Sequence, residues 1–218
     1  MPWRFLNRRD AGVELAAKLR AHAHARDDVL VLALPRGGVP VGYEVAQALG
    51  AGVDVLIVRK LGVPKHPELS MGAIASGGAR HLNDDVLRHA GIDASTLLAV
   101  ELRERRELDR RERLYRGARP ASPVRGKTLI LVDDGIATGA SMHVAAAAVR
   151  SLAPASLVVA VPVAPAEATQ WFAGVADDFV CVHSPRHFQA VGDLYREFGQ
   201  VTDNEVRELL GHAHPPRP

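Results

Sequence analysis

Short runs of consecutive apolar residues alternate along the chain with segments in which apolar residues recur every three or four positions. The runs predict strands at 29–34, 53–58, 128–132, 157–163 and 179–183. The helical spacing predicts helices at 11–24, 41–49, 142–152 and 166–174, and a last helix after Thr202 and Asp203. Regular alternation of strands and helices is typical of βαβ units. We therefore expect an α/β fold in which helices flank a central, mostly parallel sheet, as one domain over residues 1–211.

The segment 93–116 differs from the rest because charged residues dominate it. Oppositely charged residues lie four positions apart, as in Glu107 and Arg111, and each such pair stabilises an exposed helix by a few tenths of a kcal/mol. Leu108 and Tyr115 share one face and form a thin apolar stripe. Its arginines could contact a nucleic acid or another subunit, but acids alternate with them throughout. A solvated helical insertion is therefore the favoured interpretation.

The composition is that of a soluble globular protein. Hydrophobic residues make up 47% of the 218 residues and charged residues 24%, and a net charge of +2 is too small to indicate a nucleic-acid partner. No apolar run approaches the roughly 18 residues of a membrane span, so we expect a cytoplasmic protein with no membrane partner. The single cysteine, Cys181, can form no disulfide within the chain. Residues 212–218 lack an apolar run, and we expect them to be a disordered tail.

The most informative segment is 129–141, where four apolar residues lead directly into Asp133 and Asp134. Ligands of a parallel sheet lie beyond the carboxyl ends of its strands. The turn that follows offers backbone N–H groups, two hydroxyls and the start of a helix, which together suit a phosphate group. Its residues are Gly135, Ile136, Ala137, Thr138, Gly139, Ala140 and Ser141. Two acids beside such a turn favour a phosphorylated polyol, because its hydroxyls can donate to the acids while its phosphate occupies the turn.

This segment resembles the phosphoribosyl pyrophosphate (PRPP) motif of type I phosphoribosyltransferases. A buried strand with an acidic turn and a capped helix would explain Asp133 and Thr138, but not all thirteen positions. The family more often has an aliphatic residue or Ser at position 135, so we expect Gly135 to loosen the turn. The resemblance implies that a nitrogen acceptor, usually a nucleobase, displaces pyrophosphate from PRPP with the help of Mg²⁺. Asp133 and Asp134 would then contact the ribose hydroxyls or, through water, the metal.

A second glycine-containing loop, Arg36-Gly37-Gly38, follows the first predicted strand. Two glycines permit backbone conformations in which neighbouring N–H groups converge on an anion, and Arg36 adds a cation that matches phosphate oxygens. The same residues could simply form a tight turn between a strand and a helix. By resemblance to the family, Arg36, Gly37 and Gly38 would bind the pyrophosphate of PRPP.

Two cations, Arg59 and Lys60, precede a segment at 61–78 that is rich in glycine and contains two prolines. This segment resembles the mobile loop with which the family covers its ligand and excludes water, and we expect an irregular lid here. Lys65, Glu68 and Ser70 could approach the ligand when the lid closes, although ordinary surface polarity explains them equally well. With Asp133, Asp134 and Arg36, Lys60 is a candidate catalytic residue; Arg59 is a candidate for substrate binding.

The acceptor is not specified by any motif in the sequence. Family members that use 6-oxopurines usually carry an acid at the position of Ala137, whose side chain resembles that of the adenine enzymes instead. Phe188 could line the acceptor site, or it could belong to the core. The sequence thus predicts a transferase of nucleotide metabolism, and a homodimer is compatible with it. The alternative is a PRPP-binding regulatory protein that has lost catalysis.

Overall fold

The computed structural model describes residues 3–22, 28–186 and 189–213, and its centre is a five-stranded parallel sheet in the order β2-β1-β6-β7-β8. The strands are β1 (Val29–Ala33), β2 (Gly52–Val55), β6 (Thr128–Val132), β7 (Ser156–Val163) and β8 (Asp178–His183). Every neighbouring pair runs parallel. The α/β fold with a parallel central sheet, expected from the alternating pattern, is confirmed.

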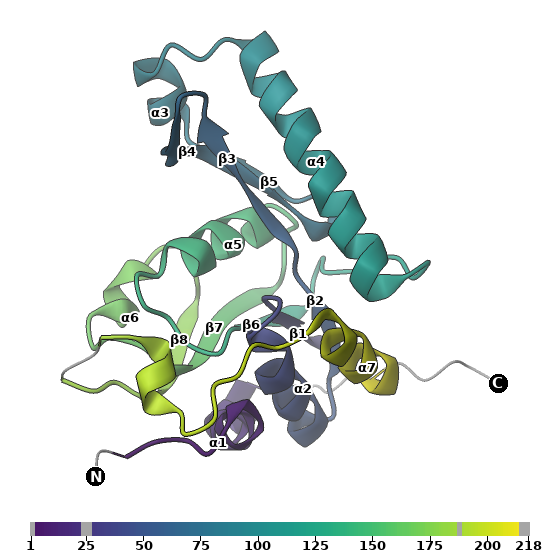
Figure 1. The fold of residues 1–218 in the computed structure, drawn as a ribbon, viewed down its shortest axis with the longest axis vertical. Coiled ribbons are helices and arrows are strands. Elements are labelled where there is room, and N and C mark those ends of the chain that lie inside the picture. Colours follow the sequence, from purple (N-terminus) through teal and green to yellow (C-terminus); the bar gives the residue numbers. More distant parts are fainter. Residues whose placement is uncertain (1–2, 23–27, 187–188, 214–218) are drawn as a thin grey trace.

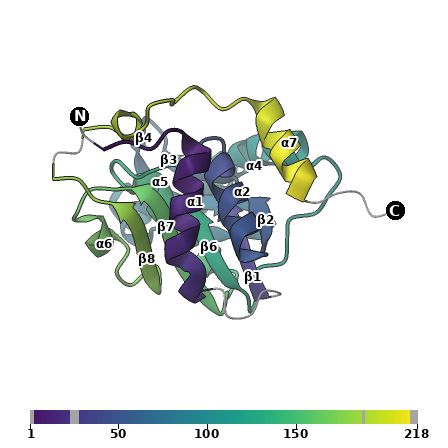
Figure 2. The ribbon, with the colours of Figure 1, turned by 90° about the horizontal axis from the view of Figure 1, so that it is seen from below.

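Helices cover both faces of this sheet (Figures 1 and 2). Helices α1 (Arg8–Leu19) and α2 (Gly38–Leu49) pack on one face, and α5 (Ala140–Arg150) with the short α6 (Ala168–Trp171) on the other. The apolar residues of β6 divide between these two sides, because successive side chains of a strand point in opposite directions. Leu129 and Leu131 join the cluster under α5, whereas Ile130 and Val132 join the cluster under α1 and α2. Coverage of both faces explains why β1, and β6 after Thr128, are apolar without interruption.

A smaller unit, which we call the hood, stands above the sheet in Figure 1. It contains an antiparallel sheet of β3 (Val58–Val63), β4 (His66–Ala75) and β5 (Arg80–Leu82), together with α3 (Asp84–His89) and α4 (Ala94–Arg116). The C-terminal helix α7 (Asp203–Ala213) contacts both α2 of the core and α4 of the hood. Three short 3-10 turns complete the described elements: Arg20–His22, Ser76–Gly78 and Val191–Leu194.

The prediction of an irregular lid at 61–78 is wrong, because this segment forms the β3–β4 hairpin and the turn after it. Apolar residues of the hairpin, Leu61, Met71 and Ile74 among them, are fully buried in the cluster that the hood shares with α7. The single strand expected at 53–58 is also wrong. It divides into β2, which pairs in the central sheet, and β3, which enters the hood.

The other elements occur with shifted ends. The helix expected at 166–174 is only the four residues of α6. Helix α7 continues through Ala213, so residues 212 and 213 are not part of a disordered tail; residues 214–218 lie outside the described residues. None of the described helices is long and apolar enough to cross a membrane.

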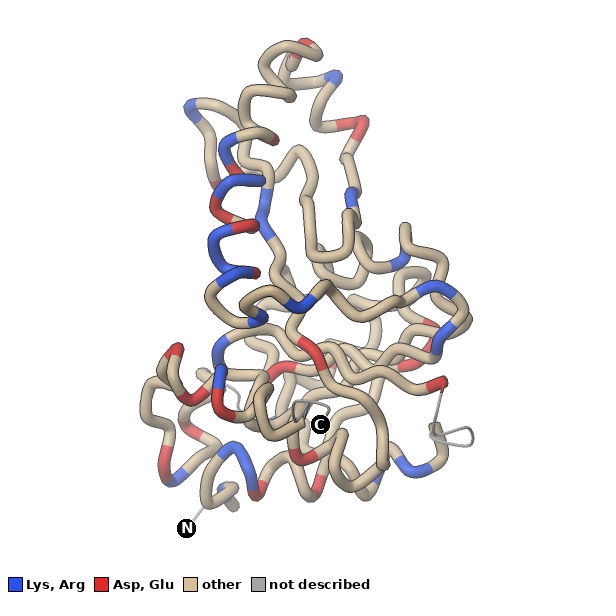
Figure 3. The backbone as a smooth tube through the Cα atoms, turned by 90° about the vertical axis from the view of Figure 1, so that its right-hand side faces the viewer, with Lys and Arg blue, Asp and Glu red and all other residues tan. Residues whose placement is uncertain are grey.

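The predicted charged helix is confirmed as α4, and Asp93 caps it by accepting a hydrogen bond from the N–H of Thr96. Figure 3 shows basic and acidic residues alternating along it. It is more than a solvated insertion, however. Glu104 and Arg116 are buried with Leu108 and Tyr115, so one face of α4 packs against the rest of the molecule.

Candidate active site

The acidic loop predicted from the sequence lies at the carboxyl end of β6, between Val132 and the start of α5. Gly139 precedes the helix with a φ of 75°, and a Cβ atom there would lie 2.7 Å from the Trp171 ring. Only glycine meets both conditions without strain. The loop and the first turn of α5 line a pocket of about 170 Å³, formed by Asp133 and residues 135–142. This is the arrangement of N–H groups and helix start that suits a phosphate group.

Gly135 does not loosen the loop, contrary to the expectation. A Cβ atom at this position would lie 2.5 Å from a methyl carbon of Val191 and 2.6 Å from one of Val163. The N–H of Ile136 donates to the carbonyl oxygen of Val163 at 2.9 Å, and Ile136 itself is buried. The turn is therefore fixed by close packing against β7 and the 191–194 turn.

The second glycine loop lies directly against the two acids. A Cβ atom on Gly37 would lie 2.1 Å from Oδ2 of Asp134, and one on Gly38 would lie 2.9 Å from Cα of Asp133. The contact begins where the N–H of Leu34 donates to the carbonyl oxygen of Val132 at 2.8 Å. The two loops thus form one continuous edge, and any side chain at position 37 would displace the carboxylate below it.

Asp133 and Asp134 have different surroundings. Asp133 lines the loop pocket and accepts a hydrogen bond from the N–H of Asp134 at 2.9 Å. Asp134 faces away from that pocket, and its Oδ2 accepts a hydrogen bond from Nε of Arg8 at 2.8 Å. Tyr195 donates from its hydroxyl to the backbone carbonyl of Asp134 at 2.6 Å. Asp133 is therefore the acid exposed to a ligand, whereas Asp134 is held by the N- and C-terminal parts of the chain.

Burial raises the pKa of both acids. For Asp133 the pKa lies well above its ordinary value, first because of desolvation and second because Asp134 is close. The pKa of Asp134 is also raised by desolvation, and the hydrogen bond and charge of Arg8 oppose that rise. Arg8 is thus the cation that partly compensates this pair of neighbouring carboxyl groups.

Arg8 is itself held on three sides. Its Nη1 donates to the carbonyl oxygen of Gly199 at 2.7 Å, and its guanidinium lies 3.9 Å from the ring centre of Phe198. Only 12% of the Arg8 side chain and 15% of the Asp134 side chain are exposed. The backbone of Phe5 pairs with that of Leu194 and Arg196, which brings the start of α1 to this place. Arg8 was missed at the sequence level, since no local pattern connects residues 126 positions apart.

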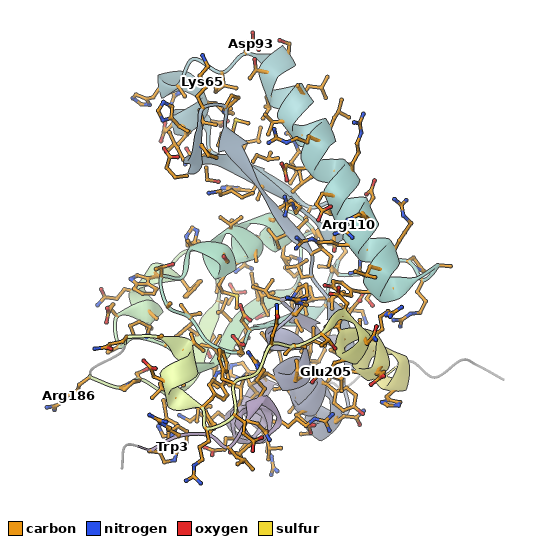
Figure 4. The ribbon with its side chains drawn as sticks, in the orientation of Figure 1. Trp3, Lys65, Asp93, Arg110, Arg186 and Glu205 are labelled. Atoms are coloured by element: carbon orange, nitrogen blue, oxygen red, sulfur yellow. The ribbon has the colours of Figure 1, made fainter. Side chains whose placement is uncertain are left out.

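A larger cavity of about 540 Å³ opens between the core and the hood. Seven predicted site residues line it, from both the acidic loop and the hood hairpin: Arg59, Lys60, Glu68, Ser70, Asp133, Ala140 and Ser141. Lys65 does not, because it occupies the hairpin turn, near the far end of the hood in Figure 4. Arg36 is also absent from the lining; its Nη1 lies 3.7 Å from Oδ1 of Asp203, and its side chain is 37% exposed.

Each of the two predicted cations on the hood side of the cavity has a partner. Arg59 pairs with Glu104 of α4 at 2.5 Å, and Nζ of Lys60 donates to the carbonyl oxygen of Glu68 at 3.3 Å. A further cation, Arg111 of α4, lines the same cavity and was missed at the sequence level. The signal was present, since Arg111 lies three residues after Leu108 and four before Tyr115, on the face that packs inward.

The cavity residues could hold a metal ion that is bound mainly by a substrate. Among the described residues, no group of three or more His, Cys, Asp or Glu side chains could hold a metal. Asp133 offers carboxylate oxygens, the ligands that Mg²⁺ prefers, and Mg²⁺ often takes its other ligands from phosphates and water. The position of Phe188, the proposed wall of the acceptor site, lies outside the described residues.

The sheet order, the acidic loop after β6 and the hood together define a type I phosphoribosyltransferase fold. Residues 6–195 match the phosphoribosyl transferase domain family, and the chain belongs to that family. The crystal structure of TT1426 from Thermus thermophilus superimposes with a TM-score of 0.85 at 43% identity, over 95% of this chain and 97% of that one.

Two curated relatives come from Mycobacterium tuberculosis, strains CDC 1551 / Oshkosh and H37Rv, and each carries the name "Putative phosphoribosyl transferase". Each is 47% identical over 210 residues, which cover 96% of this chain and 47% of the relative. The chain therefore spans about half the length of the curated relatives it matches.

Proposed function

We propose that this chain transfers the ribosyl 5-phosphate group of PRPP to a nitrogenous acceptor, with release of pyrophosphate. The observation that carries the proposal is the convergence of three features on one cleft. The phosphate-type loop at 135–141 and Asp133 lie on the core side, and Arg59 and Lys60 lie opposite on the hood. Asp133 lines both the loop pocket and the larger cavity with the two cations, just as the ribose of PRPP lies between its phosphate and its pyrophosphate.

In this proposal the loop pocket holds the 5-phosphate through its N–H groups and hydroxyls. Asp133 accepts hydrogen bonds from the ribose hydroxyls, and Lys60 and Arg59 neutralise the pyrophosphate as it leaves. The hood covers the ligand, which limits attack by water on the ribosyl cation. Mg²⁺ would neutralise part of the charge of the pyrophosphate when bound with it. Asp134 contributes indirectly, since its carboxylate packs against Gly37 and so positions the glycine loop.

The direct test is a panel of nucleobases and other nitrogen acceptors, incubated with the full chain, PRPP and Mg²⁺ while pyrophosphate release is measured. Release that depends on one acceptor is the expected result. Asp133→Asn should abolish pyrophosphate release. Asp178→Asn should not, because Asp178 is an exposed acid at the amino end of β8.

If no acceptor gives release of pyrophosphate, titration calorimetry with PRPP shows whether the protein binds PRPP at all. Binding of PRPP without release, for every acceptor, would favour the regulatory alternative. Absence of PRPP binding by the unmodified protein, with and without Mg²⁺, would contradict both interpretations.

A further inference from the structure

Helix α4 carries an acid that two neighbouring arginines share. Glu107 accepts hydrogen bonds from Arg110 at 2.8 and 3.0 Å and from Nε of Arg111 at 2.8 Å. These bonds, that from Arg110 first, lower the pKa of Glu107 to about 2, so the carboxylate stays charged throughout the neutral range. One negative charge thus faces two positive charges, and the trio keeps an excess of one positive charge.

The same arrangement occurs one turn earlier on the helix. Glu104 accepts hydrogen bonds from Arg59 of β3 at 2.9 Å and from Arg103 at 3.0 Å. In each trio one arginine lines the cavity, namely Arg59 or Arg111, and the other does not. The outer arginines are more exposed, at 70% of the side chain for Arg103 and 59% for Arg110.

The cavity therefore has an excess of positive charge on its hood wall. Arg59, Lys60 and Arg111 line it, and the acids among its described lining residues are Glu68 and Asp133. The acids on α4 hold the inner guanidiniums at the wall while they leave donor groups available, because a guanidinium has five N–H donors. Such a wall attracts an anion with several oxygens, and a bidentate contact with Arg111 would be directional as well as strong.

We infer that Arg111 is a ligand-binding residue of this cleft, held in position by Glu107, and that it binds the pyrophosphate group of the donor. The inference rests on the proposed function. The inference gives helix α4 a direct role in ligand binding, in addition to the acidic loop and the glycine loop.

The pyrophosphate end of the donor is the group that fits this position. The small pocket is lined by the acidic loop and the first turn of α5, whereas the larger cavity contains Arg111 together with Lys60 and Ser70 of the hood. A ligand whose 5-phosphate occupies the small pocket would therefore direct its second anionic end toward the hood wall. Ribose 5-phosphate lacks that second end, which makes it a suitable control ligand.

The test compares two arginines that share one carboxylate. Arg111→Gln and Arg110→Gln remove the same charge from adjacent positions of the same helix, but only Arg111 lines the cavity. The affinities of both variants and of the unmodified chain are measured by calorimetry for inorganic pyrophosphate, PRPP and ribose 5-phosphate, with Mg²⁺ present. Thermal unfolding of each variant provides a check on the fold.

Arg111→Gln should weaken pyrophosphate and PRPP about tenfold or more, as expected for loss of a charge-assisted hydrogen bond, and leave ribose 5-phosphate unchanged. Arg110→Gln should change each affinity less than about twofold, and Arg111→Lys should recover part of the loss. Equal effects of the two glutamine variants, or a loss for ribose 5-phosphate as large as that for PRPP, would overturn the assignment. If the unmodified chain binds neither PRPP nor pyrophosphate, the proposed function fails as well.

Discussion

Removing Arg8 should destabilise the protein more than removing the charge of its partner Asp134. Arg8→Gln eliminates the ion pair, the hydrogen bond to the carbonyl of Gly199 and the contact with the ring of Phe198. It also leaves two neighbouring buried acids without the cation that faces them. Asp134→Asn keeps an oxygen that can accept from Arg8, and it removes the repulsion between the two acids.

The expected magnitudes follow from these contacts. Breaking a buried ion pair by removing one partner costs about 3 to 5 kcal/mol, and the lower end applies because each side chain keeps about one-eighth of its surface exposed. We expect a loss of about 3 kcal/mol for Arg8→Gln and about 1 kcal/mol for Asp134→Asn. The double variant should lose about 2 kcal/mol, less than the sum, since neither Arg8 nor Asp134 is left in it without its partner.

The pH dependence of the Arg8→Gln loss gives an independent readout. The folded-state pKa values of both acids are raised, so the folded state binds protons more readily than the unfolded state and is destabilised as the pH rises through the range above 3.8. Without Arg8 these pKa values should rise further. The stability lost in Arg8→Gln should therefore be largest at pH 7 and smaller at pH 5, where the acids take up protons more readily.

Urea unfolding at both pH values, followed by circular dichroism, measures all four proteins of the cycle. Arg9→Gln is the matched control, because Arg9 is the exposed neighbour on the same helix turn. Equal losses for Arg8→Gln and Arg9→Gln, or strictly additive losses for the two single variants of the pair, would refute the reasoning. A loss that does not change between pH 7 and pH 5 would show that the acids are not the groups left uncompensated.

Three further predictions concern the cleft. Asp133→Asn should weaken PRPP binding at least tenfold in calorimetry without lowering the unfolding midpoint, because this acid lines the ligand cavity rather than supporting the fold. Gly37→Ala should weaken pyrophosphate binding through displacement of Asp134, since its Cβ would lie 2.1 Å from that carboxylate; unchanged affinity would show that the loop tolerates the shift. Hypoxanthine and guanine should be poor acceptors in the release assay, because Ala137 cannot exchange a proton with the base, and such help is typically worth roughly 10²–10⁴ in rate.

The hood hairpin gives a fifth prediction, in which the structure replaces the expectation from the sequence. Lys60 pairs with Ala73 and Arg59 with Ile74 in an antiparallel ladder that is regular from Val58 to Leu61 and shifts register after Leu61. Amides of this ladder should therefore exchange slowly without any ligand, in contrast to an open lid. Fast exchange across the whole of 61–78 in the free protein, measured by mass spectrometry, would restore the lid interpretation.

Local patterns were sufficient for the central sheet and for the acidic loop. The strand at 128–132 is buried on both faces and is apolar from Leu129 to Val132, and its end is marked by two adjacent acids. The hood hairpin could not be predicted because of its composition. Its glycines and prolines suggested an irregular loop, whereas Gly72 is required because a Cβ atom there would lie 2.4 Å from the carbonyl oxygen of His81 on the neighbouring strand.

Long-range charges could not be predicted in the same way. Arg8 meets Asp134 only because the backbone of Phe5 pairs with a segment almost 190 residues later, and no periodicity records that contact. Arg111 carried a partial signal in its spacing from Leu108 and Tyr115. That signal was outweighed by the many acids of α4, although two of those acids, Glu104 and Glu107, turn out to bind the arginines of the cleft.

The distribution of charge explains why a ligand would join the two parts of the molecule. The core alone presents an acid, Asp133, whose partner Asp134 is already compensated by Arg8 from below. The hood alone presents Arg59, Lys60 and Arg111 with incomplete compensation. A ligand that carries both hydroxyls and a pyrophosphate satisfies both sides at once. Neither a simple phosphate nor a neutral base can do so, which is the physical reason for proposing PRPP as a ligand of this cleft.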